Sequence, residues 1–174
     1  MTASREMTTA NDMARLLAMT RDHTIFAFEL DFAGTLRCIP MIVRFKLDLA
    51  GIKLTLRQWS QFERPERQQL VEWPRGDEAE VGVYRRYVLE IIARRADEPP
   101  VDIAVDPLPV WDQTDSVPER LVRQARDLEL APPTLEQWRA ITPLQRFTLF
   151  KLTRPGHDND NFEPAMHEFG LLAR

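Results

Sequence analysis

The sequence is poor in cysteine, and its single thiol, Cys38, excludes an internal disulfide. A chain without disulfides fits a reducing compartment. Long apolar runs are also missing, since no stretch approaches the roughly 18 residues that a membrane-spanning helix needs. Residues 1–22 mix acidic and basic side chains with short apolar pieces, which is not the pattern of a signal peptide. We therefore expect a cytoplasmic protein with no membrane contact.

Glycine is scarce as well, with six residues in a chain of 174. Neither the glycine-rich phosphate loop nor the dinucleotide-binding fingerprint is present. The G-x-S-x-G and H-E-x-x-H patterns, which position a nucleophile or a zinc ion, are missing too. From these absences we expect a protein that is not an enzyme and that uses no cofactor.

Positive charge is not in excess, because the net charge is −4 and the isoelectric point is near 5.5. Domains that bind nucleic acids usually carry a strongly basic face, so we expect no nucleic-acid partner. The apolar share of 44% and the charged share of 29% are typical of a folded globular chain. The length suits one domain. We predict an N-terminal extension or helix at 1–22 and a single helical domain at 23–174.

Helical periodicity dominates what is present. Pro40 suits the first turn of a helix and Gly51 suits its C-terminal stop, and the apolar residues between them occupy two faces. In "DEAEVGVYRRYVLEIIARRA", which begins at Asp77, apolar residues recur at intervals of three and four. The predicted fold class is mainly α, with a compact core of packed helices.

Two segments break this trend with strict alternation of apolar and polar residues, "TIFAFELDF" and "VDIAVD". A period of two predicts strands, at 25–32 and 101–106, which could pair as one small β ribbon. Extended arms packed on the helices are the alternative. The acidic, proline-rich residues 97–115 are predicted to form an extended connector anchored by Trp111.

An internal repeat links the two halves. "TLRQWSQFERPERQQL" from Thr55 and "TLEQWRAITPLQRFTL" from Thr134 align without a gap at an offset of 79 residues. In each copy, threonine and the glutamine three residues later form the capping box of a short helix, and a proline opens the next helix. We predict two pseudo-repeated helical units, 39–74 and 117–153. Neither is large enough to bury its own apolar face, so the two should pack together.

Two places invite a chemical interpretation. Cys38 lies beside Arg37 and near a helix N-terminus, which can activate a thiol, but its apolar neighbours and the lack of a second cysteine favour an inert residue. The C-terminal "HDNDNFEPAMHEF" concentrates acidic residues and histidines without the spacing of a calcium or zinc site. We expect a polar loop that leads into a helix, and no metal.

The blocks "FELDFAGTLRCIPMIVRFKLDLAGIKLTLRQW" and "TLEQWRAITPLQRFTLFKLTRPGHDNDNFEPAMHEFGL" carry a family resemblance over residues 26–171. The chain resembles the nitrate reductase associated protein family of nitrate-assimilating bacteria. The resemblance implies a small protein that supports assimilatory nitrate reductase, a molybdopterin and iron–sulfur enzyme, and it transfers no catalytic residue. The matching positions that we treat as candidate interaction residues are Arg37, Cys38, Pro40, Arg44, Lys46, Asp48, His157, Asn161 and Phe162.

The functional hypothesis is a non-enzymatic accessory protein that binds nitrate reductase or a cofactor-delivery partner. One alternative is a small cofactor- or metal-binding protein, or an enzyme, that uses Cys38 together with the loop 157–161. A second alternative is a helical regulatory or nucleic-acid-binding module built on the repeated hairpins. The sequence assigns no oligomeric state.

Overall fold

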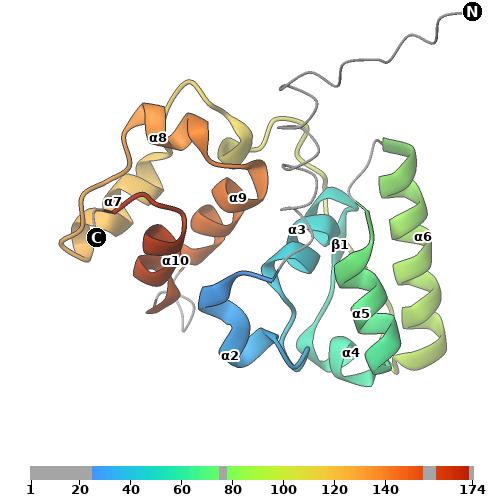
Figure 1. The fold of residues 1–174 in the computed structure, drawn as a ribbon. Coiled ribbons are helices and arrows are strands. Elements are labelled where there is room, and N and C mark those ends of the chain that lie inside the picture. The colour runs from blue at the N-terminus through green and yellow to red at the C-terminus, as the bar shows by residue number, and fades with distance from the viewer. Residues whose placement is uncertain (1–24, 75–77, 155–159, 173–174) are drawn as a thin grey trace, which may run out of the picture.

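The computed structural model describes residues 25–74, 78–154 and 160–172. The predicted extension at 1–22 and the positions Asp77 and His157 lie outside these residues. The described chain is mainly α-helical, as predicted, with one two-stranded sheet (Figure 1). In chain order the elements are η1 (Ala27–Glu29), α2 (Leu30–Ala33), α3 (Met41–Leu49), β1 (Ile52–Lys53), α4 (Leu56–Gln61), α5 (Arg64–Glu72), α6 (Glu78–Arg95), β2 (Val101–Asp102), η2 (Val110–Asp112), α7 (Glu119–Asp127), α8 (Leu135–Ala140), α9 (Pro143–Leu152) and α10 (Phe162–Glu168).

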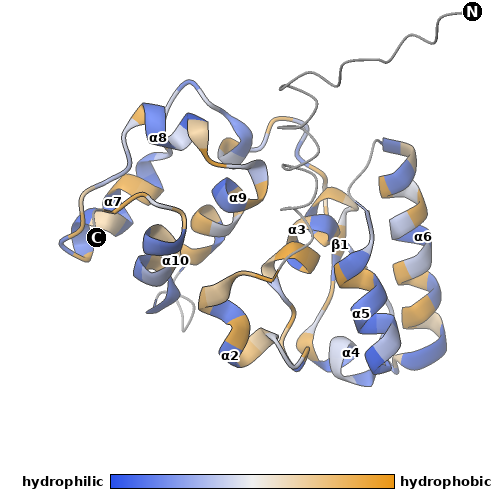
Figure 2. Cartoon of the chain, viewed as in Figure 1, coloured by the Kyte–Doolittle hydropathy of each residue, from blue (hydrophilic) through white to orange (hydrophobic). Residues whose placement is uncertain are grey.

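Two hydrophobic clusters form the core. The first lies among α3, α4, α5 and α6, and the second lies among α7, α8, α9 and α10. The helices α3 and α9 join them, because Phe147 of α9 belongs to the first cluster and Met41 of α3 belongs to the second. In Figure 2 the ribbon of α5 is mostly hydrophilic, whereas α3 carries more apolar residues, in keeping with its central position.

The predicted strand at 25–32 is wrong. These residues form η1 and α2, with Leu30 and Phe32 exposed and Glu29 buried. The Glu29 carboxylate accepts the backbone N–H groups of Phe26 (3.1 Å) and Met41 (3.0 Å), which favours a turn at the position where alternation predicts extension. The strand predicted at 101–106 is reduced to β2, and its antiparallel partner is β1.

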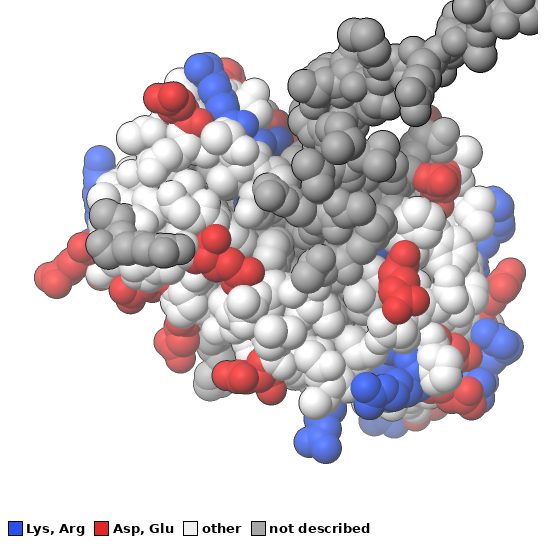
Figure 3. All heavy atoms as spheres, in the orientation of Figure 1, with Lys and Arg blue, Asp and Glu red and all other residues white. Residues whose placement is uncertain are grey.

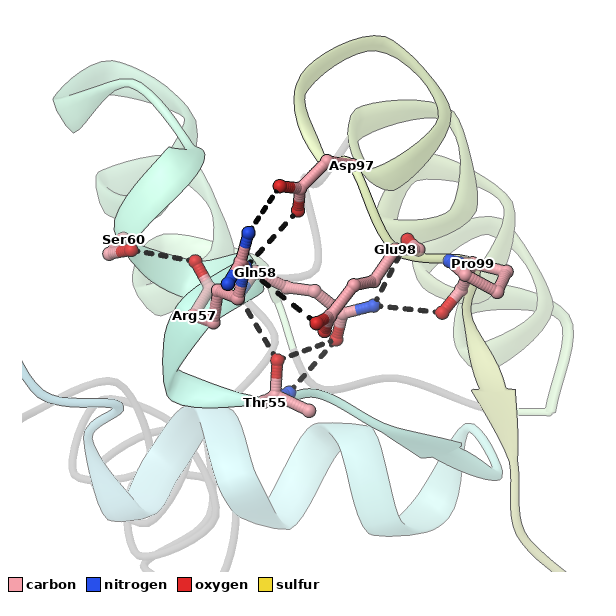
Figure 4. Close-up of polar contacts among 7 residues, drawn as sticks. All are labelled: Thr55, Arg57, Gln58, Ser60, Asp97, Glu98 and Pro99. Carbon is pink, nitrogen blue, oxygen red and sulfur yellow. Dashed lines mark hydrogen bonds and ion pairs between the residues drawn. The ribbon is translucent and has the colours of Figure 1, made fainter.

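The connector that follows α6 is held at its start by α4 (Figure 4). Thr55 and Gln58 form the predicted capping box of α4, and the Gln58 amide nitrogen also donates to the carbonyl of Pro99 at 3.0 Å. Arg57 pairs with Asp97 at 2.6 Å beside it. Further along, Trp111 is buried, as the prediction of an anchor requires. The connector is therefore fixed at both ends.

The helices α3, α4 and α5 have counterparts in α7, α8 and α9. The capping box of α4 recurs in α8, from Thr134 to Gln137. The indole nitrogens of Trp59 and Trp138 each donate to a backbone carbonyl at 2.8 Å. In the third helix of each set an arginine donates to the carbonyl five residues earlier, from Arg67 to Phe62 and from Arg146 to Ile141. These contacts recur at the offset of the sequence repeat, and common descent of the two units stays a prediction.

The turn between α3 and β1 depends on Gly51, whose φ is +68°. A Cβ atom there would lie 3.0 Å from the Ile103 carbonyl oxygen and 3.0 Å from Val105 Cγ2. We expect Gly51→Ala to lower the free energy of unfolding by about 1–3 kcal/mol, because the left-handed conformation and the crowding both oppose a side chain. Urea unfolding measures this change.

Gly82 is the matched control, because it lies inside α6 and an added Cβ atom would meet open space there. We expect Gly82→Ala to leave the stability unchanged or to raise it by up to about 1 kcal/mol. Equal stability of the two alanine variants would contradict the role given to Gly51.

Candidate functional site

A surface groove lies between α3, the end of α9 and the β ribbon, with a volume of about 390 Å³. Its apolar lining comprises Ile39, Met41, Leu47, Ile52, Leu54 and Ile103, and its charged lining comprises Arg44, Asp48, Lys53, Lys151 and Arg154. Four cations therefore share one groove with a single carboxylate, in a chain whose net charge is −4. Acidic and basic side chains both occur on the face drawn in Figure 3.

An ion pair joins α3 and α9, which together form one wall of the groove. Arg44 and Asp48 lie one turn apart on α3, as the helical spacing predicts. Asp48 accepts from Lys151 Nζ of α9 at 2.8 Å, and the Lys151 ammonium lies 4.9 Å from the ring centre of Phe147. Arg44 Nε donates to the Ile39 carbonyl at 3.0 Å, which holds its guanidinium beside the start of the helix.

The ribbon wall is fixed by Arg85 of α6. Its guanidinium donates to the carbonyls of Ala50 (2.7 Å) and Gly51 (3.1 Å) and pairs with Asp102 at 2.5 Å. Lys53 and Val101 are directly opposite in the antiparallel pairing, so both side chains lie on one face of the ribbon. Ile103, two residues after Val101, lines the groove.

The structure divides the candidate interaction residues of the "LRCIPMIVRFKLD" block. Arg44 and Asp48 line the groove. Arg37 is exposed and Cys38 is half-buried in the loop before α3, outside the groove lining, and Pro40 is the buried N-cap of that helix instead of a first-turn residue. This loop is therefore separate from the groove.

Lys46 is turned away from the groove and is 5% exposed. Its ammonium donates to the carbonyls of Leu70 (3.4 Å), Val71 (2.8 Å) and Trp73 (2.6 Å) at the end of α5. The last carbonyls of a helix have no partner within the helix, and a cation there also complements the helix dipole. Lys46 thus ties α3 to the C-terminus of α5.

The C-terminal candidates have mostly packing roles where they are described. Asn161 is the N-cap of α10, and Phe162 is fully buried in the second cluster. Within residues 25–74, 78–154 and 160–172, no group of three or more histidine, cysteine, aspartate or glutamate side chains could hold a metal ion. The interpretation that pairs Cys38 with the loop 157–161 stays a prediction, because residues 157–159 lie outside the described part of the chain.

Glu29 was missed by the sequence analysis, although it is the one polar residue buried in its segment. Its side chain is 1% exposed and lies beneath the N-terminus of α3, where Met41 donates to it. Burial raises the pKa of the Glu29 carboxyl to about 7, although the backbone N–H groups of Met41 and Phe26 and the charge of Arg44 act in the opposite direction. The stretch "FAFELDF" could have indicated a buried carboxyl, because its glutamate directly follows an apolar run.

Fold and groove together define a class, a small and mainly α-helical protein with a cationic groove at its surface. The chain belongs to the family of conserved nitrate reductase-associated proteins, whose model matches residues 25–169. The family name links the chain to nitrate reductase and is consistent with an accessory role. No curated protein and no solved structure matches the chain.

Among the residues that the structure describes, no helix combines the length with the apolar character required to cross a bilayer.

Proposed function

We propose that the chain is a non-enzymatic accessory protein that supports the activity or maturation of assimilatory nitrate reductase. It does so by binding the reductase or a partner that delivers a cofactor to it. Membership of the nitrate reductase-associated family supports the enzyme connection. The observation that carries the binding role is the groove between α3, α9 and the ribbon, where cationic and apolar side chains share one concave surface.

The chemistry of the groove favours recognition over catalysis. Its described lining consists of aliphatic, methionine, cationic and aspartate side chains, without the hydroxyl, thiol or imidazole groups that serve as nucleophile and base in most covalent mechanisms. Arginine and methionine are enriched where proteins bind one another. Both occur here, at Arg44, Arg154 and Met41.

The repeated hairpins do not favour a nucleic-acid partner. Arg67 donates to the carbonyls of Leu36 and Phe62, and Arg146 is 6% exposed and donates to Trp111 and Ile141. These arginines stabilise the interior of the protein, whereas the recognition helices of DNA-binding proteins present their arginines to base edges and phosphates. A protein partner is therefore the better-supported proposal.

The proposal is tested by deleting the gene and assaying nitrate reductase in nitrate-grown cells at equal amounts of reductase protein. We expect activity to fall and to return with the wild-type gene or with Arg86→Glu/Arg123→Glu, which reverses two exposed charges outside the groove. Lys53→Glu/Arg154→Glu, which reverses two charges inside it, should fail to restore activity. Unchanged activity after deletion would refute the accessory role.

A further inference from the structure

The groove also indicates the chemistry of what it binds. We infer that it receives an acidic segment of a partner protein whose carboxylates meet the α3 and α9 wall and whose apolar side chains lie on the β ribbon. This inference rests on the proposed function, because it names the kind of partner segment that the accessory protein would hold.

Charge gives the first reason. The groove lining contains four cationic side chains and one carboxylate, that of Asp48, so cationic groups predominate in it although the protein as a whole is acidic. Complementary potentials steer encounter and fix register across protein interfaces. A segment that carries aspartate or glutamate supplies that complement, whereas the net charge of −4 repels a polyanion such as a nucleic acid.

The ribbon gives the second reason. Val101 is 45% exposed, Ile103 is 37% exposed and Val105 is 52% exposed, so three apolar side chains in close succession face solvent. Val101 shares its face of the ribbon with Lys53, and Ile103 borders the groove. Contiguous exposed apolar side chains rimmed by charge are a mark of protein-binding sites. A small inorganic anion would use the cations and leave this apolar surface uncovered.

The shape gives the third reason. The groove volume of about 390 Å³ falls in the range of clefts that enclose ligand groups. Its walls are held before any partner arrives, on one side by the Asp48–Lys151 pair and on the other by Arg85, which bonds to Ala50, Gly51 and Asp102. A preorganised site loses less conformational freedom on binding.

The test selects random dodecapeptides from a display library on the full-length chain and measures the enriched peptides by fluorescence polarisation. We expect enrichment of peptides that combine carboxylates with aliphatic residues, and weaker binding as salt rises. Lys53→Glu/Arg154→Glu should weaken binding about tenfold or more. Val101→Ser/Val105→Ser should weaken it several-fold, whereas Arg86→Glu/Arg123→Glu should bind as the wild type does.

Three outcomes would overturn the inference: no enrichment, enrichment of neutral or basic peptides, or equal binding to the groove variant and the wild type. Full competition by millimolar phosphate, together with unchanged binding to the serine variant, would reduce the groove to a simple anion site and also refute it. The selection does not involve the reductase. If the peptide selection fails while gene deletion lowers reductase activity, only the peptide inference is refuted. If the selection succeeds while deletion leaves activity unchanged, only the proposed function is refuted.

Discussion

Lys46→Met should lower the free energy of unfolding by about 2–4 kcal/mol, because the ammonium and its hydrogen bonds are lost from a buried site. The variant keeps the length and apolar stem of the side chain but leaves the carbonyls of Val71 and Trp73 without their short contacts at 2.8 and 2.6 Å. It also removes the positive charge beside the C-terminus of α5. The α3–α5 contact should therefore weaken without a large cavity.

Urea unfolding followed by tryptophan fluorescence measures this effect, with Lys53→Met as the matched control. Lys53 is exposed on β1, so its replacement should change stability by no more than about 0.5 kcal/mol. If both variants unfold at the same urea concentration, the helix-terminus role of Lys46 is refuted. A large loss of stability in Lys46→Met alone would indicate that Lys46 belongs to the family motif because it stabilises the fold.

The second large effect concerns pH and Glu29. The carboxyl has an ordinary pKa of 4.5 and a pKa of about 7 in the folded chain, so the folded state holds a proton that the unfolded state has released between these values. Its contribution to stability is therefore present below about pH 4.5 and is lost as the pH rises through 7. The full loss is at most about 3–4 kcal/mol.

Glu29→Gln isolates this contribution, because glutamine does not titrate while it keeps the size of the side chain. We expect the stability of the wild type relative to Glu29→Gln to decline as the pH rises from about 4.5 through 7, with the steepest change between these two values. Unfolding free energies of both proteins across that range give the difference directly. A difference that stays constant, or that grows with pH, would contradict a carboxyl whose pKa is raised by burial.

Local sequence signals determined much of the helical fold. The capping boxes from Thr55 to Gln58 and from Thr134 to Gln137 are formed as predicted, and Gly51 ends the turn after α3. Each of these signals acts within one or two helical turns, so it can be recognised without knowing the rest of the structure. The family resemblance was confirmed by the match over residues 25–169.

Segments with weak local preference could not be predicted in this way. Alternation at 25–32 indicated a strand, but contacts with other parts of the chain favour a helical turn. Met41 donates to the Glu29 carboxylate, and Glu168 of α10 accepts the N–H groups of Ala27 and Phe28. The partner of β2 was likewise missed. Its partner β1 contains only Ile52 and Lys53, and about 50 residues of chain separate the two strands.

The sequence by itself determined a mainly helical chain, its caps, its repeat pattern and its family, because these depend on neighbouring residues or on whole motifs. Only the tertiary structure decided the candidate site. It separated Arg44 and Asp48, which line the groove, from Lys46, which lies on the same helix but caps α5. It also brought Lys151 of α9 to Asp48 of α3. Such contacts join residues far apart in the chain, and they arise only when both helices pack on a shared core.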